Sequence, residues 1–322
     1  MGFRIKSTAH AVPQQVLTND DLAQRMETSD EWIRTRTGIR QRHIATTETT
    51  TSLAVATAQQ LLQRSGIAAT ELDFIIVCTM SPDQLTPSTA ALVQGAIGAN
   101  KAFAFDLNAA CSGFIYSLSV AAQFFTEGTP YRYGLVIGSE CLSRLLDWQD
   151  RTTAVLFGDG AGGVLLEHQS QGLLGQHLAA DGSQAAALKA GEVVASTEIV
   201  NWVNYKLDPF KMDGRAVYRF ATHAVPDSLQ QAVASSPYAL ADIDHFLLHQ
   251  ANTRIIAQVA KRLGQPLTKF PQNMAAYGNT SAASLPILLD ECVQSQQVQR
   301  GDVLALSGFG GGLTVGSQIL IY

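Results

Sequence analysis

The residue best suited to nucleophilic chemistry is Cys111, which stands where a buried apolar strand predicted over 102–107 meets a buried apolar helix predicted over 113–125. A helix N-terminus carries unpaired backbone N–H groups and the positive end of the helix dipole, and both favour an anion. Such a position lowers the pKa of a cysteine and favours the thiolate, its nucleophilic form. A buried structural cysteine is the alternative interpretation, and position alone does not decide between them.

Two further residues could assist such a nucleophile. His249 ends an apolar strand and precedes a polar loop, whereas Asn279 follows Gly278 and precedes an apolar helix over 285–293. Taken singly, a histidine at a strand end is more often a structural hydrogen bonder, and an asparagine before a helix is usually a cap. The glycine-rich run 307–312 would let the backbone approach another group closely, or would simply form a tight turn between two strands.

A repeat within the chain explains how these residues could meet. Residues 70–79 and 241–250 share one order, which is an acidic loop, an apolar strand and a polar residue at the strand end. An amphipathic helix predicted over 221–234 precedes the second copy. Residues 109–113 and 278–284 both precede an apolar helix. The strand pair is offset by 171 positions and the helix pair by 170, so a duplicated strand–helix unit of about 170 residues accounts for both.

This duplication predicts two similar halves, residues 1–170 and 171–322. Strands alternate with helices in each half, so the sheets should be largely parallel and lie between helices. Sites in α/β folds lie at strand ends and helix N-termini. Because related points of the halves face each other across a pseudo-twofold axis, the repeat would bring Cys111, His249 and the Asn279 loop toward one pocket.

The composition argues against several classes of function. The chain has 22 basic and 27 acidic residues, a net charge of −5, which gives no attraction to nucleic acid or to an anionic membrane. We find no apolar signal core at the N-terminus and no apolar run long enough to cross a bilayer, so we expect a cytoplasmic protein. Four widely spaced cysteines without a Cys-x-x-Cys pair fit a reducing compartment and predict no metal site.

One glycine pattern could mislead. Residues 158–163 have the G-x-G-x-x-G spacing of a dinucleotide site, but residues 164–167 are predicted to be a strand. A dinucleotide site requires a helix there, so we predict no nicotinamide cofactor.

Six short motifs together resemble one enzyme family. They are residues 29–39 (SDEWIRTRTGI), 108–114 (NAACSGF), 157–162 (FGDGAG), 249–252 (HQAN), 278–282 (GNTSA) and 309–312 (FGGG). Over nearly its whole length the chain is similar to β-ketoacyl-acyl-carrier-protein synthase III, a condensing enzyme of the thiolase-like fold. The resemblance implies an α/β fold of two similar halves, each with a mixed sheet between helices, in five layers.

The resemblance also implies a Cys-His-Asn catalytic set, which falls on Cys111, His249 and Asn279. Cys111 would take an acyl group from an acyl-CoA, with the N–H groups of Cys111 and Gly311 as the oxyanion hole. Malonyl-acyl carrier protein would then lose CO₂ while His249 and Asn279 hold the enolate. The resulting carbanion would attack acyl-Cys111 and give 3-oxoacyl-acyl carrier protein, the start of fatty acid synthesis. No cofactor is implied.

Binding residues follow from the same resemblance. CoA and its pantetheine arm would contact Trp32, Arg36, Arg151, Gly214 and Asn252. The acyl pocket would involve Thr86, Phe157 and Phe309. The acidic carrier protein would dock on Arg219, Arg254, Lys261 and Arg262, of which the last three share one predicted helix.

Position 86 bears on the substrate. In this family a residue near it reaches across a homodimer interface and helps to close the acyl pocket, and some members carry a bulky aromatic there. Thr86 would leave more room, so we expect a homodimer that accepts acyl groups longer or more branched than acetyl.

Two alternative functions stay open. One is a starter-unit ketosynthase or acyltransferase of a polyketide or secondary lipid pathway, and the other is a non-catalytic acyl-binding homologue. Residues 182–210 show no motif that would help to choose.

Overall fold

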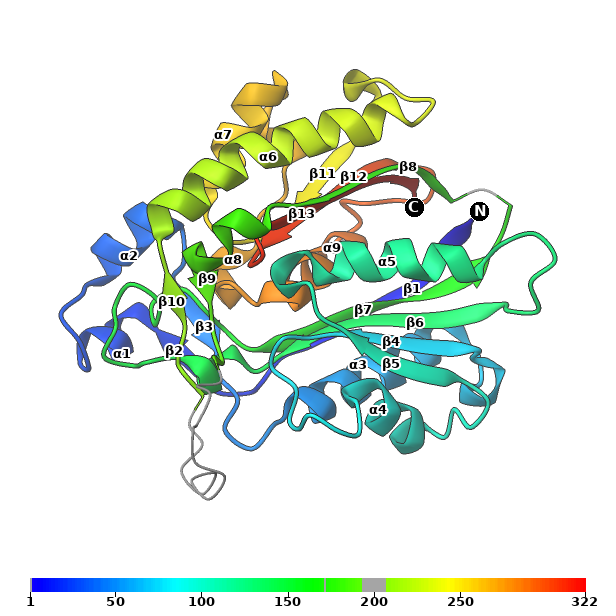
Figure 1. Ribbon diagram of the computed structural model, residues 1–322, viewed down its shortest axis with the longest axis horizontal. Coiled ribbons are helices and arrows are strands. Elements are labelled where there is room, and N and C mark those ends of the chain that lie inside the picture. The colour runs from blue at the N-terminus through cyan, green and yellow to red at the C-terminus, as the bar shows by residue number, and fades with distance from the viewer. Residues whose placement is uncertain (1, 171, 193–206) are drawn as a thin grey trace.

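The computed structural model describes residues 2–170, 172–192 and 207–322, which form two main β-sheets with helices on both faces (Figure 1). Much of the motif-free stretch 182–210 lies outside the described residues, which omit 193–206. The first sheet contains β1 (Phe3–Ala11), β4 (Phe74–Cys78), β5 (Phe103–Leu107), β6 (Tyr133–Glu140) and β7 (Gly160–His168). The second sheet contains β8 (Leu173–Ala180), β11 (His245–Leu248), β12 (Val303–Gly310) and β13 (Thr314–Ile321).

The two sheets repeat one topology. The first has the order β1-β7-β6-β4-β5, and the second has β8-β13-β12-β11, which matches the first four positions. Pairing agrees as well, because β4 is parallel to β6 just as β11 is parallel to β12, while the two strands beyond them pair antiparallel in both sheets. Each sheet is therefore mixed, as the resemblance to the thiolase-like fold implies. The expectation of largely parallel sheets is wrong, because β1, β7 and β6 pair antiparallel in the first sheet and β8, β13 and β12 do so in the second.

Five layers are visible in Figure 1. The helices that form three of them are α3 (Thr50–Ser65), α4 (Thr89–Ile97), α5 (Gly113–Phe124), α6 (Gly214–Ala234), α7 (Thr253–Leu263) and α9 (Ser284–Gln294). Helices α3 and α4 cover the outer face of the first sheet, and α6 and α7 cover the outer face of the second. Helices α5 and α9 lie between the sheets and contact both of them.

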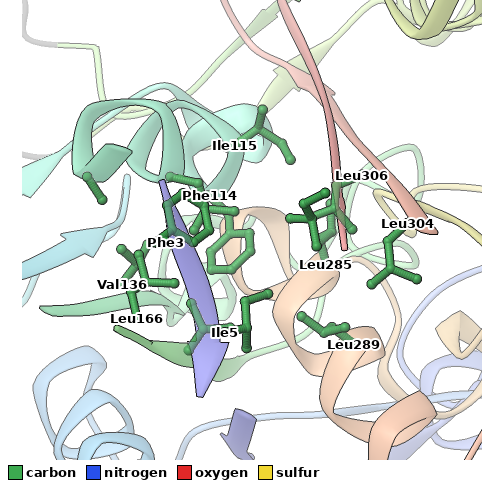
Figure 2. Packing of buried hydrophobic residues seen from close by; sticks show 14 of the residues in the cluster. Phe3, Ile5, Phe114, Ile115, Val136, Leu166, Leu285, Leu289, Leu304 and Leu306 are labelled. Atoms are coloured by element: carbon green, nitrogen blue, oxygen red, sulfur yellow. The ribbon is translucent and has the colours of Figure 1, made fainter. Parts of the chain in front are cut away.

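The space between the sheets holds an apolar core. Figure 2 shows Phe3 and Ile5 of β1 beside Phe114 of α5, with Leu285 of α9 and Leu306 of β12 across from them. All five side chains are at most 3 % exposed. Burial of this size is the main stabilising contribution to a fold, and here it fixes α5 and α9 against both sheets. The N-termini of these two helices carry the motifs that contain Cys111 and Asn279.

Smaller elements complete the chain. They are β2 (Val16–Thr18), α1 (Asn19–Ala23), α2 (Asp30–Thr37), β3 (Gln41–His43), β9 (Leu188–Lys189), β10 (Lys211–Met212) and α8 (Met274–Tyr277). β2 pairs with β3, and β9 pairs with β10. No helix in the described part of the chain combines the length and the apolar composition that a bilayer crossing requires.

Local capping signals set the helix ends. The Thr49 side chain accepts the Ser52 N–H at the start of α3, and Gly66 ends that helix in the left-handed conformation. The Asp213 side chain accepts two backbone N–H groups at the start of α6, so this helix begins at Gly214, seven residues before the start predicted at residue 221. The prediction was wrong because it followed the amphipathic part of the helix and overlooked the cap.

Two other expectations need correction. The strand that precedes Cys111 is not buried, since β5 lies at an edge of the first sheet and its residues are exposed or half-buried. Apolar composition alone does not distinguish an edge strand from a central one. The repeat also has a single offset of 171, because Ala110 and Ser281 share a left-handed φ of 46° and 49° and each opens a 3₁₀ turn that precedes a helix. Cys111 therefore corresponds to Ala282 and not to Ser281.

Candidate active site

Cys111 lies in the 3₁₀ turn Ala110–Ser112, between the end of β5 and the start of α5. The left-handed conformation of Ala110 turns the chain sharply at this point, and few residues other than glycine adopt it. The cysteine is buried, and β12 lies close against it. A Cβ added at Gly310 would lie 2.8 Å from Cys111 Cβ and 3.2 Å from its Sγ. Only a glycine lets the backbone of β12 approach the sulfur so closely.

Asn279 is held by backbone pairing with the segment before β7. Its N–H donates to the Leu156 carbonyl at 2.9 Å, and its own carbonyl accepts the Gly158 N–H at 3.0 Å. Gly278 precedes it with a φ of 66°, which a larger residue would adopt only with strain. The Asn279 Oδ1 accepts the Ser281 N–H at 2.9 Å. Its amide nitrogen therefore remains as the donor of this buried side chain.

His249 follows β11, and its N–H donates to the Ser307 carbonyl of β12 at 2.8 Å. The ring Nδ1 forms a 2.5 Å hydrogen bond with Ser284 Oγ, and the ring packs edge-on against Phe309 at 5.2 Å between centroids. Burial lowers the pKa of His249 to about 3, because a charged imidazolium would lose its hydration there. The imidazole is therefore neutral at any pH near 7.

Cys111, His249 and Asn279 line one cavity of 230 Å³. The rest of its wall is mostly apolar and includes Leu156, Phe157, Val217, Ile255 and Phe309. The three polar residues come from the N-terminus of α5, the end of β11 and the loop before α9, as the repeat predicts. These three residues lie far apart in the sequence, and the packing of α5 and α9 between the two sheets brings them together.

Burial raises the pKa of the Cys111 thiol to about 12. The expectation of a lowered pKa is therefore not met in the substrate-free chain, because desolvation of the sulfur outweighs the groups that favour the thiolate. A neutral thiol beside a neutral imidazole is the resting state of the site. Ionisation of the sulfur must accompany attack on a substrate.

A second cavity of 570 Å³ also reaches Cys111. It is lined by Cys111, Gly311, Phe157, Met80, Leu107, Tyr116, Phe210, Leu188 and Ala190, among others. Phe157 forms part of both cavities and stacks on Phe210 at 4.5 Å, whereas Phe309 lines only the first cavity. The sequence analysis missed Met80, Tyr116 and Phe210, because each lies in a segment without a motif.

The first cavity opens beside a third hollow of 730 Å³ at the surface. Gly214, Tyr218 and Asn252 line both, and Arg36, Arg215 and Arg254 complete the outer wall. The Asn252 side chain caps α7 and also donates to the Arg36 carbonyl at 3.0 Å. Arg215 and Tyr218 were not predicted, although their position on the first turns of α6 beside Gly214 is the signal that could have identified them.

Three of the residues predicted to contact CoA, which are Trp32, Arg36 and Arg151, lie together next to this opening. The guanidinium of Arg36 lies 4.5 Å from the Trp32 ring centroid, and that of Arg151 lies 5.4 Å from it. Arg151 also donates to the Glu27 carbonyl at 2.9 Å. An aromatic ring with two guanidinium groups close to it suits a flat base that carries phosphates.

The other predicted residues are at the surface. Arg219 lies on α6, and Arg254, Lys261 and Arg262 lie on the neighbouring α7, all of them exposed. Thr86 lies on an exposed loop, and it lines neither of the two cavities beside Cys111. Its neighbour Leu85 is 94 % exposed.

The glycine pattern of residues 158–163 enters strand β7, which confirms the strand predicted over 164–167. Within residues 2–170, 172–192 and 207–322 there is no group of three or more His, Cys, Asp or Glu side chains that could hold a metal ion.

Comparisons with known proteins agree with this arrangement. The family described as 3-oxoacyl-[acyl-carrier-protein] synthase III matches residues 105–182, and its C-terminal region matches residues 233–322. The chain is 51 % identical over 328 aligned residues to the β-ketoacyl-[acyl-carrier-protein] synthase III of Latilactobacillus sakei, with all of both chains covered.

Solved structures extend this agreement to the fold. The 3-oxoacyl-[acyl-carrier-protein] synthase III of Aquifex aeolicus has a TM-score of 0.92 at 40 % identity, with all of both chains covered. The priming β-ketosynthase of the R1128 polyketide pathway also has a TM-score of 0.92, at 31 % identity over 99 % of this chain and 96 % of that one. The fold, the full-length identity and the two family matches together show that this chain belongs to the β-ketoacyl-acyl-carrier-protein synthase III family.

Proposed function

We propose that this chain condenses an acyl-CoA with malonyl-acyl carrier protein and releases CO₂, giving a 3-oxoacyl-acyl carrier protein that starts fatty acid synthesis. The observation that carries this proposal is that Cys111, His249 and Asn279 line one mostly apolar cavity, while Cys111 also lines a second, separate cavity. A thioester could reach the sulfur through the first cavity and leave its acyl group in the second.

In the first step Cys111 attacks the thioester carbonyl of the acyl-CoA. The thiol loses its proton as the bond forms, and CoA leaves as its thiol. The N-terminus of α5 favours negative charge on the sulfur. The N–H groups of Cys111 and Gly311 would hold the oxyanion, which requires the glycine-rich end of β12 to lie against the nucleophile as it does.

In the second step malonyl-acyl carrier protein occupies the first cavity and loses CO₂. Negative charge then develops on its thioester oxygen, and Asn279 can donate from Nδ2 while His249 can donate from its ring. Both groups are uncharged, so neither holds the malonyl carboxylate in place as an ion pair would. The apolar rings of Phe157 and Phe309 further favour loss of the charged malonyl carboxylate as CO₂. The carbanion attacks acyl-Cys111 and frees the thiolate. These steps use only side chains and backbone N–H groups of the protein, so no cofactor is invoked.

The acyl group would lie in the second cavity. A volume of 570 Å³ exceeds what acetyl needs, and the wall includes Met80 and Tyr116. Thr86 would approach this cavity only from a partner subunit, since in its own chain it lies on an exposed loop. A threonine there leaves space, so the proposed starter is an acyl-CoA longer or more branched than acetyl-CoA.

The opening lined by Arg36, Arg215 and Arg254 would bind the phosphates of CoA, with adenine against Trp32. Arg151, Gly214 and Asn252 would complete the contacts to CoA and its pantetheine arm. The acidic carrier protein would dock on the exposed basic residues of α6 and α7 by local charge complementarity, despite the negative net charge of the chain.

A homodimer is part of the proposal. Strand β5 is an edge of the first sheet, and its Phe103 and Phe105 belong to a partly exposed aromatic cluster with Phe124 and Tyr131. An unpaired strand edge with apolar side chains is a surface that proteins cover. Pairing of two such edges would bring the loop of Thr86 toward the partner.

The proposed location is the cytoplasm, because the four free cysteines suit a reducing compartment.

A priming ketosynthase of polyketide synthesis would use the same residues. The observation that favours the fatty acid enzyme is the higher identity to the synthase III of Latilactobacillus sakei, 51 % against 31 %. An acyltransferase would form the acyl adduct and make no 3-oxo product. A non-catalytic homologue would form no adduct.

The test is a panel of acyl-CoA substrates with malonyl-acyl carrier protein, read by product mass. We expect 3-oxoacyl products from isobutyryl- and hexanoyl-CoA. Efficient use of acetyl-CoA with no turnover of either longer substrate would reject the proposed acyl preference. Absence of any condensation product would reject the proposed reaction.

A further inference from the structure

A buried serine stands behind the catalytic-site histidine. Ser284 is the first residue of α9, is 2 % exposed, and its Oγ lies 2.5 Å from His249 Nδ1. The same Oγ accepts the backbone N–H of Gln250 at 3.3 Å. Among the described residues no protein group hydrogen-bonds to His249 Nε2, and the ring lines the cavity of Cys111.

The hydrogens of this group can be counted. A hydroxyl has one hydrogen to donate and two lone pairs, and a neutral imidazole has one N–H and one acceptor nitrogen. If Nδ1 carried the hydrogen, Ser284 Oγ would accept two hydrogen bonds, and its own hydrogen would have no partner among the bonds of the described residues. If Ser284 donates to Nδ1, both the Ser284 hydroxyl and Nδ1 are satisfied, and Nε2 carries the ring hydrogen toward the cavity. Buried polar groups are almost always satisfied, so the second arrangement is favoured.

We propose that Ser284 is a positioning residue that donates to His249 Nδ1 and thereby holds the Nε2–H tautomer with its N–H directed into the cavity. This inference rests on the proposed function, because an Nε2–H can stabilise an enolate oxygen, whereas a bare Nε2 lone pair would repel it. It means that the hydrogen-bond donors for the second half-reaction, loss of CO₂, are oriented before the substrate arrives. Ser284 contacts no substrate and acts only through the ring.

The first experiment measures the tautomer directly. Nitrogen-15 spectra of the histidine side chains distinguish a protonated ring nitrogen from an unprotonated one, and the His249→Ala spectrum identifies the signals of this ring. In the substrate-free wild-type protein we expect Nε2 protonated and Nδ1 unprotonated. A ring protonated at Nδ1 would overturn the inference. This result does not depend on activity, so it stands even if the proposed reaction is wrong.

The second experiment measures the two half-reactions of Ser284→Ala. We expect decarboxylation of malonyl-acyl carrier protein to slow about 10-fold or more, as for loss of one buried hydrogen bond. Acylation by acyl-CoA, measured as adduct mass, should keep its wild-type rate. Equal loss in both steps would mark a merely structural role, and no loss in either would also overturn the inference.

The chain offers a matched control. Ser228 of α6 is also buried and its Oγ lies 3.0 Å from the Nδ1 of another histidine, His177 of β8, away from the cavity. Ser228→Ala removes the same kind of bond, so both half-reactions should keep their wild-type rates. If Ser228→Ala slowed decarboxylation as much as Ser284→Ala does, the effect would not be specific to His249. If Ser284→Ala does not fold, the wild-type spectrum still decides.

Discussion

Replacing Gly310 by alanine would test whether β12 must lie against the nucleophile. The added Cβ would be 2.8 Å from Cys111 Cβ, 2.9 Å from its backbone nitrogen and 3.2 Å from its Sγ. Favourable carbon–carbon contacts begin at roughly 3.5 Å, so the closest contact is too short by about 0.7 Å. Two of the three atoms belong to the rigid turn before α5, so a side-chain rotation does not relieve the clash.

Overpacking of this kind costs about 1–3 kcal/mol of stability. We therefore expect the free energy of unfolding of Gly310→Ala to fall by that amount in urea denaturation. Displacement of the sulfur should also slow acylation, and a loss of about 1.4 kcal/mol in the transition state corresponds to about a tenfold lower rate. Acylation is measured as the single-turnover appearance of adduct mass after mixing with acyl-CoA.

Gly95→Ala is the matched control, because Gly95 is an exposed residue of α4 with nothing within 4 Å of an added Cβ. That change should raise stability by about 0.4–1 kcal/mol and leave acylation unchanged. Wild-type stability together with wild-type acylation in Gly310→Ala would refute the reasoning, since it would mean that β12 and Cys111 have room between them.

Four further substitutions test His249, Asn279, Thr86 and Glu140, the buried last residue of β6. His249→Ala and Asn279→Ala should each slow malonyl decarboxylation by about 100-fold, as for loss of an oxyanion donor, and acylation much less; the reverse pattern would show that their roles are wrongly assigned. Burial raises the pKa of Glu140 to about 7. The protonated carboxyl therefore contributes fully to the free energy of unfolding below about pH 4.5, and this contribution is lost as the pH rises to 7. Relative to Glu140→Gln, the wild type should lose about 3 kcal/mol across that range in urea unfolding, and a pH-independent difference would contradict this. Thr86→Phe should shift the acyl-CoA preference toward acetyl by about tenfold in kcat/KM, while an unchanged preference would remove Thr86 from the pocket.

The sequence was informative where local signals and the repeat agree. The strand-to-helix junction predicted the turn of Cys111. The offset between the halves predicted that Cys111, His249 and Asn279 approach one another, and they line one cavity. Each of these signals is carried by residues close together in the chain or by a regular spacing.

The remaining features depend on contacts that no local pattern encodes. The apolar composition of 102–107 fits a central strand as well as the edge strand β5. Position at a helix N-terminus predicts a lowered pKa for Cys111, but the burial that raises this pKa comes from distant elements. Ser284 resembles any residue at a helix start, and only the fold places it beside His249 Nδ1.

The most direct test of the account is the intact mass of the protein after mixing with isobutyryl-CoA, followed by peptide mapping and then by addition of malonyl-acyl carrier protein. We predict one acyl group per chain, located on Cys111, which disappears as 3-oxoacyl-acyl carrier protein forms. Cys111→Ala should remain folded, carry no acyl group and form no condensation product. An adduct at another residue, or condensation by Cys111→Ala, would contradict the central claim that Cys111 carries the acyl group.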